Sequence, residues 1–200
     1  MITETINSIQ LSFETANTVF SHNCIDKGTL AMVTSVDFSP DDKLLDLGCG
    51  YGVVGIYAAK LIGDQNIVMS DNDNKCIELS RLNAKMNSVD GVSTVLSDGF
   101  NSITDNNFTL ILSNPPYHTD FSVPKRFIEK GFNRLKIGGK MYMVTKRKDW
   151  YKNKLIAIFG GVKVIEVDDY YVFCSEKHSM QYASKTPYQT RKRHASERSD

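Results

Sequence analysis

The chain has 200 residues, of which 41% are hydrophobic and 24% charged, and its formal net charge is +1. This composition is typical of a globular domain, and the near-zero net charge excludes a protein that attracts nucleic acid through its overall charge. No apolar run approaches the ~20 residues of a membrane span, and residues 1–8 lack the pattern of a signal peptide. The cysteines form no CxxC pair, which predicts no metal site and free thiols in a reducing cytoplasm.

Strands and helices are predicted to alternate along most of the chain. Ile9, Leu11 and Phe13 indicate a short strand or hairpin, and residues 19–40 form a connector with a helical stretch near residues 29–36. The predicted strands after it are residues 43–47, 67–70, 92–96, 108–112, 140–145, 162–167 and 170–175. The predicted helices are residues 53–62, 74–86, 123–135, where Gly138 and Gly139 stop the helix, and 150–159. This rhythm predicts an α/β fold: a Rossmann-like, mostly parallel sheet, an antiparallel C-terminal edge strand and helices on both faces.

The chain is expected to have three parts. Residues 1–40 form an N-terminal strand and helix extension, and residues 41–175 form the main domain. Residues 176–200 are polar, basic and almost free of aliphatic side chains, so we expect a disordered or loosely attached tail. Basic residues also gather at 146–154, where phosphate contacts and a solvated helix start are both reasonable interpretations.

A glycine-rich turn follows the first strand of the main domain. Asp46 lies near the end of that strand, and Gly48, Gly50 and Gly52 follow at alternate positions. Glycines let the backbone approach a ligand closely. The dinucleotide-binding fingerprint requires another glycine at the next position, which is Val53 here.

Two further acids end the next two strands. Asp71 can accept both hydroxyls of a ribose, and Asp98 is placed to meet the amino group of an adenine. Each acid alone could be a helix cap or a solvated loop residue. Acids at three successive strand ends favour a nucleotide-like cofactor, because parallel strands end at one edge of the sheet.

These residues resemble the cofactor site of class I S-adenosylmethionine-dependent methyltransferases. The resemblance implies S-adenosylmethionine as cofactor, with Asp46 and the glycine loop near its methionine part and Asp71 on its ribose. It also implies that Asp98 and Gly99 lie near the adenine.

A rigid polar loop, Asn114-Pro115-Pro116-Tyr117, follows the apolar strand 108–112. The Asn114 side-chain oxygen and the Pro115 carbonyl can accept hydrogen bonds from a planar amine, beside the cofactor. The two prolines preorganise these acceptors, and the Tyr117 ring can stack on a base. We therefore predict Asn114, Pro115 and Tyr117 as catalytic residues, and Asn114 also as a residue that binds the cofactor. The simpler interpretation is that the prolines end a strand and Tyr117 covers the core.

The target is suggested by two further segments. Residues 19–21 (Val-Phe-Ser) with 26–30 (Asp-Lys-Gly-Thr-Leu), and His118 after Tyr117, resemble the small-subunit ribosomal RNA guanine-N2 methyltransferase C group. The resemblance covers residues 13–175, the catalytic domain of those enzymes, although Tyr117 stands where they carry Phe. It implies methylation of guanine N2 and a ribosomal RNA or small-subunit partner.

Other functions stay open. The Asn-Pro-Pro-Tyr loop also fits a glutamine-N5 protein methyltransferase or an adenine-N6 methyltransferase. A catalytically inactive RNA-binding or assembly module is the alternative outside enzymes. The sequence leaves the oligomeric state open.

Overall fold

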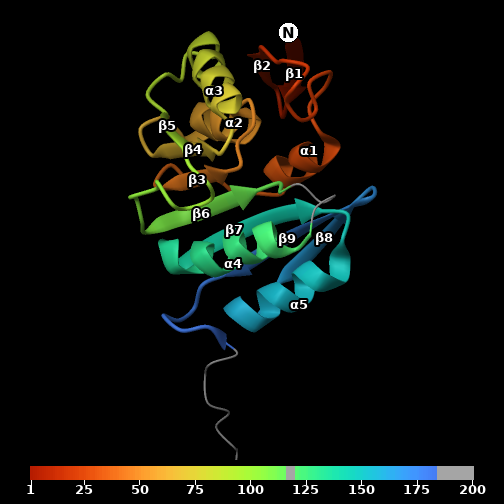
Figure 1. Ribbon diagram of the computed structural model, residues 1–200, viewed down its shortest axis with the longest axis vertical. Helices are drawn as coiled ribbons and strands as arrows, with labels where there is room; N and C mark the ends of the chain where they lie inside the picture. The colour runs from red at the N-terminus through yellow and green to blue at the C-terminus, as the bar shows by residue number, and fades with distance from the viewer. Residues whose placement is uncertain (116–119, 184–200) are drawn as a thin grey trace, which may run out of the picture.

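The computed structural model describes residues 1–115 and 120–183 (Figure 1). Its strands are β1 (Ile2–Ile6), β2 (Ile9–Phe13), β3 (Leu44–Leu47), β4 (Ile67–Asp71), β5 (Ser93–Leu96), β6 (Phe108–Ser113), β7 (Leu135–Thr145), β8 (Lys163–Val167) and β9 (Tyr170–Glu176). Its helices are α1 (Lys27–Thr34), α2 (Val53–Ile62), α3 (Asn74–Met86), α4 (Ser122–Arg134) and α5 (Lys148–Phe159).

Seven strands form one sheet in the order β5-β4-β3-β6-β7-β9-β8. The pairs among β3 to β7 are parallel, and β9 runs antiparallel between β7 and β8, so β8 is the outermost strand. This confirms the mostly parallel sheet with an antiparallel C-terminal edge hairpin. The chain runs outward from β3 to β5 and then returns to β6, on the other side of β3. That reversal is the point at which open parallel sheets bind ligands.

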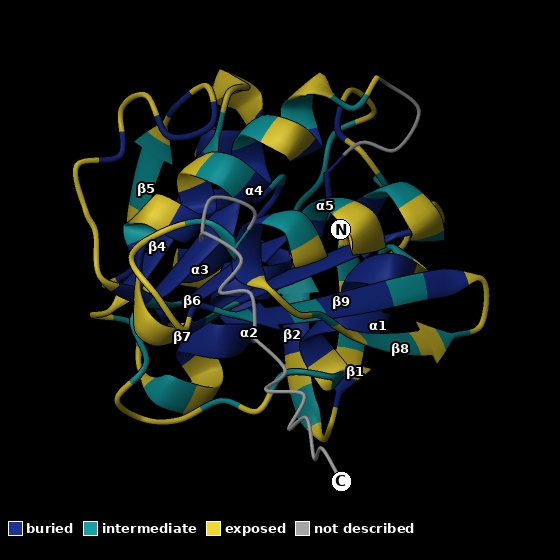
Figure 2. Ribbon diagram, turned by 90° about the horizontal axis from the view of Figure 1, so that it is seen from below, coloured by how far each residue is buried: buried dark blue, intermediate teal, exposed yellow. Residues whose placement is uncertain are grey.

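Helices cover both faces of the sheet, as predicted (Figures 1 and 2). Alternate residues of each strand point to opposite faces: Leu44 packs with α1, α2 and α3, whereas Leu45 and Leu47 pack with α4 and α5. The central strands β3, β4 and β6 are almost entirely buried between the two cores, whereas the edge strands β5 and β8 are partly exposed (Figure 2). The sheet is therefore a rigid base for the loops that leave its edges.

The N-terminal hairpin β1–β2 shares the core of α2 and α3, where its Leu11 and Phe13 are buried. Two asparagines near the end of α3 hold it through paired backbone contacts. Asn87 bonds the backbone N–H and carbonyl of Ser12, and Asn83 bonds both groups of Glu14. These contacts join the predicted extension to the main domain.

Most boundaries lie within two residues of the predicted ones, but the predicted glycine stop after α4 is wrong. Helix α4 ends at Arg134, and Gly138 and Gly139 lie inside β7, not at a helix stop. The pairing of β6 with β7 changes register after Phe108. A Cβ on Gly139 would lie 2.8 Å from the Phe108 carbonyl oxygen, so this glycine permits the close approach of the two strands.

Lys177 and Tyr182, in the first part of the predicted tail, pack on the domain, whereas residues 178–181 between them are exposed. Lys177 is buried, donates from Nζ to the Leu135 carbonyl at 2.8 Å, and its pKa is lowered by burial. The Tyr182 hydroxyl donates to the Glu129 carbonyl at 3.0 Å, and its ring packs edge-on against Phe132. Residues 184–200 lie outside the described part of the chain.

Within residues 1–115 and 120–183, no helix is long and apolar enough to cross a membrane. In that same part of the chain, no group of three or more His, Cys, Asp or Glu side chains could hold a metal ion.

Candidate active site

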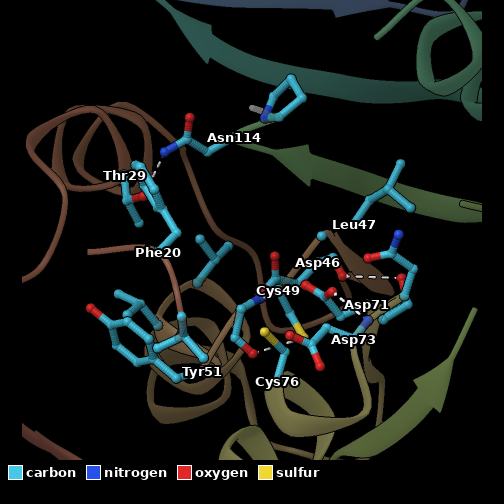
Figure 3. Close-up of a pocket in the computed structure, with 18 of the residues that line it drawn as sticks. Phe20, Thr29, Asp46, Leu47, Cys49, Tyr51, Asp71, Asp73, Cys76 and Asn114 are labelled. Carbon is cyan, nitrogen blue, oxygen red and sulfur yellow. Dashed lines mark hydrogen bonds between the residues drawn. The ribbon is translucent and has the colours of Figure 1, made fainter. Parts of the chain in front are cut away.

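A cavity of about 410 Å³ opens at the carboxyl ends of β3, β4 and β6, with the loop after β5 (Figure 3). Eight of the predicted site residues line it: Asp46, Gly48, Gly50, Asp71, Asp98, Gly99, Asn114 and Pro115. Tyr117 lies outside the described residues, so its predicted stacking role stays a prediction. Gly52 is absent from the lining.

The glycine loop leaves β3 with its backbone toward open space. Gly48 has a φ of +79° and Gly50 a φ of +55°, and no atom lies within 4 Å of a Cβ built on either residue. The loop is anchored because the N–H groups of Gly48 and Cys49 both donate to the Ser70 carbonyl. A side chain at either glycine would occupy the space that a ligand needs.

Gly52 has a different role from the predicted one. Its φ is +100°, and a Cβ there would lie 3.1 Å from the Ser80 Cβ and 3.3 Å from the Ser80 Cα. The missing side chain lets the start of α2 pack closely against α3. Gly52 therefore shapes the loop from behind and does not face the cavity.

Asp46 is almost fully buried, at 2% exposure, and its Oδ2 accepts from the Gly55 N–H at 2.9 Å. Desolvation raises its pKa to about 7, against an ordinary value of 3.8, and the nearby charge of Asp71 adds to the rise. The side chain therefore titrates near neutral pH, where a cationic ligand group would favour its charged form.

Asp71 connects the end of β4 to the glycine loop (Figure 3). Its two carboxylate oxygens accept from the Gly50 N–H at 2.9 Å and the Asp73 N–H at 3.0 Å. Each oxygen has a second lone pair. The carboxylate can therefore hold the loop and still accept two ligand hydroxyls.

Asp98 has a partner that the sequence did not indicate. Arg126 of α4 donates to both its oxygens, at 2.6 Å and 3.0 Å. The predicted contact of Asp98 with an adenine amino group stays a prediction, and Arg126 adds a positive charge to the same wall of the cavity. Gly99, with a φ of +58°, lies beside this wall against Phe127.

Asn114 lies at the opposite wall, immediately after β6. Its amide nitrogen donates to Asp26 Oδ2 and to Thr29 Oγ1, each at 2.9 Å. Figure 3 shows this nitrogen turned toward Thr29 and the amide oxygen turned away from it. The segment 26–30 supported the family resemblance in the sequence, but its contact with Asn114 was not predicted.

Two thiols also line the cavity. Burial raises the pKa of Cys49 well above its ordinary value and that of Cys76 to about 12. Both therefore stay protonated at neutral pH and act as small apolar groups.

Residues 10–174 match the family model described as "Methyltransferase small domain". A Bacillus subtilis relative, the uncharacterized protein YbxB, is 31% identical over 173 residues, which cover 83% of this chain and 86% of that protein. Ribosomal RNA small subunit methyltransferase C of Pseudomonas putida is 30% identical over 155 residues, which cover 76% of this chain and 46% of that protein.

The 16S rRNA N2 methyltransferase RsmC of T. thermophilus, solved with AdoMet and guanosine, has the same fold. Its TM-score is 0.81 at 23% identity, and the match covers 88% of this chain and 50% of that one. The chain thus spans about half the length of these two methyltransferases. The family match over most of its length shows that the chain belongs to the methyltransferase small domain family, whose cofactor is S-adenosylmethionine.

Proposed function

We propose that this protein methylates an exocyclic amine, and that the amine is guanine N2 of small-subunit ribosomal RNA. One observation carries the proposal. Asn114 and Pro115 line the same cavity as the glycine loop and Asp71, so amine acceptors and cofactor-binding groups face one space.

The residues of the cavity fit S-adenosylmethionine. Gly48 and Gly50 offer open backbone to its methionine part, with Asp46 behind them. Asp71 has lone pairs for the ribose hydroxyls, and the Asp98–Arg126 pair borders the space for adenine. When bound, the cofactor supplies an electrophilic methyl group on its sulfonium sulfur.

The other wall would prepare the amine. The lone pair of an exocyclic amine is delocalised into the ring. Acceptors at Asn114 Oδ1 and the Pro115 carbonyl would hold the two N–H bonds and favour the pyramidal, nucleophilic form. Because these acceptors are fixed in advance, they need no reorganisation during the reaction, and most of the acceleration comes from alignment. The surplus proton can leave to water after transfer.

The choice of RNA rests on the relatives and the loop sequence. Relatives in several bacteria are named ribosomal RNA small subunit methyltransferase C, including those of Pseudomonas putida and Serratia proteamaculans. In the sequence, Asn114 and Pro115 are followed by Pro-Tyr-His, and this loop resembles that of the methyltransferase C group, which carries Phe in place of Tyr117. A second candidate target is large-subunit RNA, because a Klebsiella pneumoniae relative at 28% identity is named ribosomal RNA large subunit methyltransferase G.

The test uses ribosomal subunits and naked ribosomal RNA from cells that lack this protein. Purified full-length protein and S-adenosylmethionine with a labelled methyl group are added, and nucleosides are identified by mass spectrometry. We expect N2-methylguanosine in small-subunit RNA. Label in large-subunit RNA would select the second target, whereas N6-methyladenosine, methylated protein glutamine or no transfer would contradict the proposal.

A further inference from the structure

Asp26 joins three segments that are far apart in the sequence. Its Oδ2 accepts from the Thr29 N–H and from Asn114 Nδ2, each at 2.9 Å. Its Oδ1 accepts from the Tyr170 hydroxyl at 3.3 Å. The start of α1, the end of β6 and the start of β9 therefore meet at one carboxylate on the cavity wall.

These contacts decide which end of the Asn114 amide is held by the protein and which end is turned away from Asp26 and Thr29. A carboxylate can only accept hydrogen bonds, so Asp26 must face the amide nitrogen and not its oxygen. Thr29 Oγ1 accepts the second hydrogen bond that this nitrogen donates. A reversed amide would place its oxygen against the carboxylate and its N–H groups toward the target amine, which is also a donor.

Gly28 makes this arrangement possible. A Cβ on Gly28 would lie 2.6 Å from two ring carbons of Tyr170 and 2.9 Å from Asp26 Oδ2. Because Gly28 has no side chain, the Tyr170 ring can lie over the start of α1, and its hydroxyl reaches Asp26. The Lys146 ammonium lies 4.7 Å from the centre of the same ring. The Asp-Lys-Gly-Thr segment is thus explained by contacts at the site as well as by helix capping.

We propose that Asp26, together with Thr29, is a positioning residue that fixes the Asn114 amide with its oxygen toward the target amine. The inference rests on the proposed function, in which Asn114 accepts from that amine. Asp26 itself does not touch the reacting atoms. Its effect passes through Asn114.

Two substitutions at Asp26 separate this role from capping of α1. Asp26→Ser keeps a good N-cap hydroxyl, but its side chain is too short to reach Asn114. Asp26→Asn keeps both the cap and an oxygen for Asn114. We expect Asp26→Ser to lower the single-turnover rate about tenfold with unchanged cofactor affinity in a protein that stays folded at the assay temperature, and Asp26→Asn to restore most of the rate.

Thr29 offers a second matched pair. Thr29→Val keeps the shape and the backbone N–H but removes the oxygen that accepts from Asn114, whereas Thr29→Ser keeps that oxygen. We expect a lower rate for Thr29→Val and a nearly normal rate for Thr29→Ser. Equal rates in the two variants would contradict the role of this hydroxyl.

A double-mutant cycle tests whether Asp26 acts through Asn114. In an Asn114→Ala background, Asp26→Ser should cause no further loss of rate. A full additional loss, or weaker cofactor binding in proportion to the lost rate, would overturn the inference and make Asp26 an independent catalytic or cofactor-binding residue.

The side-chain amide of Asn114 gives a readout that needs no RNA. Its NH₂ signals in an NMR spectrum, assigned by their loss in Asn114→Ala, should exchange slowly with water in the native protein and in Asp26→Asn. Exchange should be fast in Asp26→Ser. If exchange follows this pattern and no RNA is methylated, the proposed function fails but the positioning role stands. If exchange is fast in the native protein, the positioning role fails.

Discussion

The part of the cavity proposed to hold the cofactor comes mainly from one continuous stretch of chain, whereas the part proposed to hold the substrate is assembled from distant segments; we call these the cofactor half and the substrate half. The cofactor half lies within residues 46–99, apart from lining residues of α4 such as Arg126 and Phe127. The substrate half joins Asn114 to Asp26, 88 positions away, and Asp26 to Tyr170, 144 positions away. Local strand–turn–helix units can therefore build a nucleotide site, but holding an amine acceptor in one orientation needs the whole domain.

The two halves also use their polar groups differently. In the cofactor half, Asp71 and Asp98 are partly engaged by protein donors and keep lone pairs toward the cavity. In the substrate half, both N–H bonds of the Asn114 amide are engaged, and within residues 1–115 and 120–183 no donor contacts its oxygen. If this division is correct, substitutions in the first half should change affinity and substitutions in the second should change rate.

Asn114→Ala should have the largest effect. Removing one preorganised group at a reacting centre typically lowers the rate about 10²–10³-fold, and the cofactor site is formed by other residues. Single-turnover rates on the RNA substrate, with cofactor affinity measured by calorimetry, check this. Asn106→Ala, at an exposed asparagine outside the cavity, is the control. A normal rate in Asn114→Ala would remove the amine-acceptor mechanism.

Asp71→Ala should weaken cofactor binding about 10- to 100-fold, because a hydrogen bond to a charged group is worth about 1.5–3 kcal/mol. Asp71→Asn, which keeps an acceptor for the Gly50 N–H, should bind with intermediate affinity. Calorimetric titration with S-adenosylmethionine measures both. If a folded Asp71→Ala protein binds S-adenosylmethionine with native affinity, Asp71 does not hold the ribose hydroxyls.

Asp46 should make cofactor binding depend on pH. With its pKa near 7 in the free protein, the charged fraction rises about tenfold between pH 6 and 8. If that charge faces the ammonium of the methionine part, affinity should rise about tenfold over the same range. Titrations in buffers of different ionisation enthalpy would detect the released proton, and Asp46→Asn should bind equally at both pH values.

The same shift predicts a stability effect of known sign. Between pH 3.8 and about 7, folded Asp46 holds a proton that the unfolded chain has released. The free energy of unfolding should therefore fall as pH rises through this window. Thermal unfolding of the native protein, compared with Asp46→Asn at each pH, isolates this contribution. If the native protein instead became more stable relative to Asp46→Asn as the pH rises through this window, the raised pKa of Asp46 would be contradicted.

Arg126→Met should have the smallest effect. The Asp98–Arg126 pair is partly exposed, at 53% and 35% of the two side chains, and such pairs are worth about 0.2–1 kcal/mol. We expect S-adenosylhomocysteine affinity to fall by no more than about fivefold, with Arg126→Lys closer to native. Tighter binding in Arg126→Met would instead mean that Arg126 competes with adenine for Asp98.

Several elements could be predicted from the sequence because their signals are local. The helices at 53–62 and 74–86 have the predicted bounds. Gly52 and Gly63 flank the first helix, and Asp73 and Asn87 flank the second. The strand alternation also predicted the sheet, and one general rule then brought Asp46, Asp71 and Asp98 to one edge. Parallel strands end side by side, so residues at successive ends become neighbours.

The rest was decided only by tertiary structure. No periodic pattern pairs Arg126 with Asp98 or Asp26 with Asn114, because such contacts depend on how helices cross the sheet and where the chain returns. Gly52 and Gly139 looked like loop and helix-stop residues, yet each permits close approach of a distant backbone or helix. Residue spacing thus determined the fold and the cofactor edge, whereas the packing of α1, α4 and β9 on the sheet determined how the substrate side is oriented.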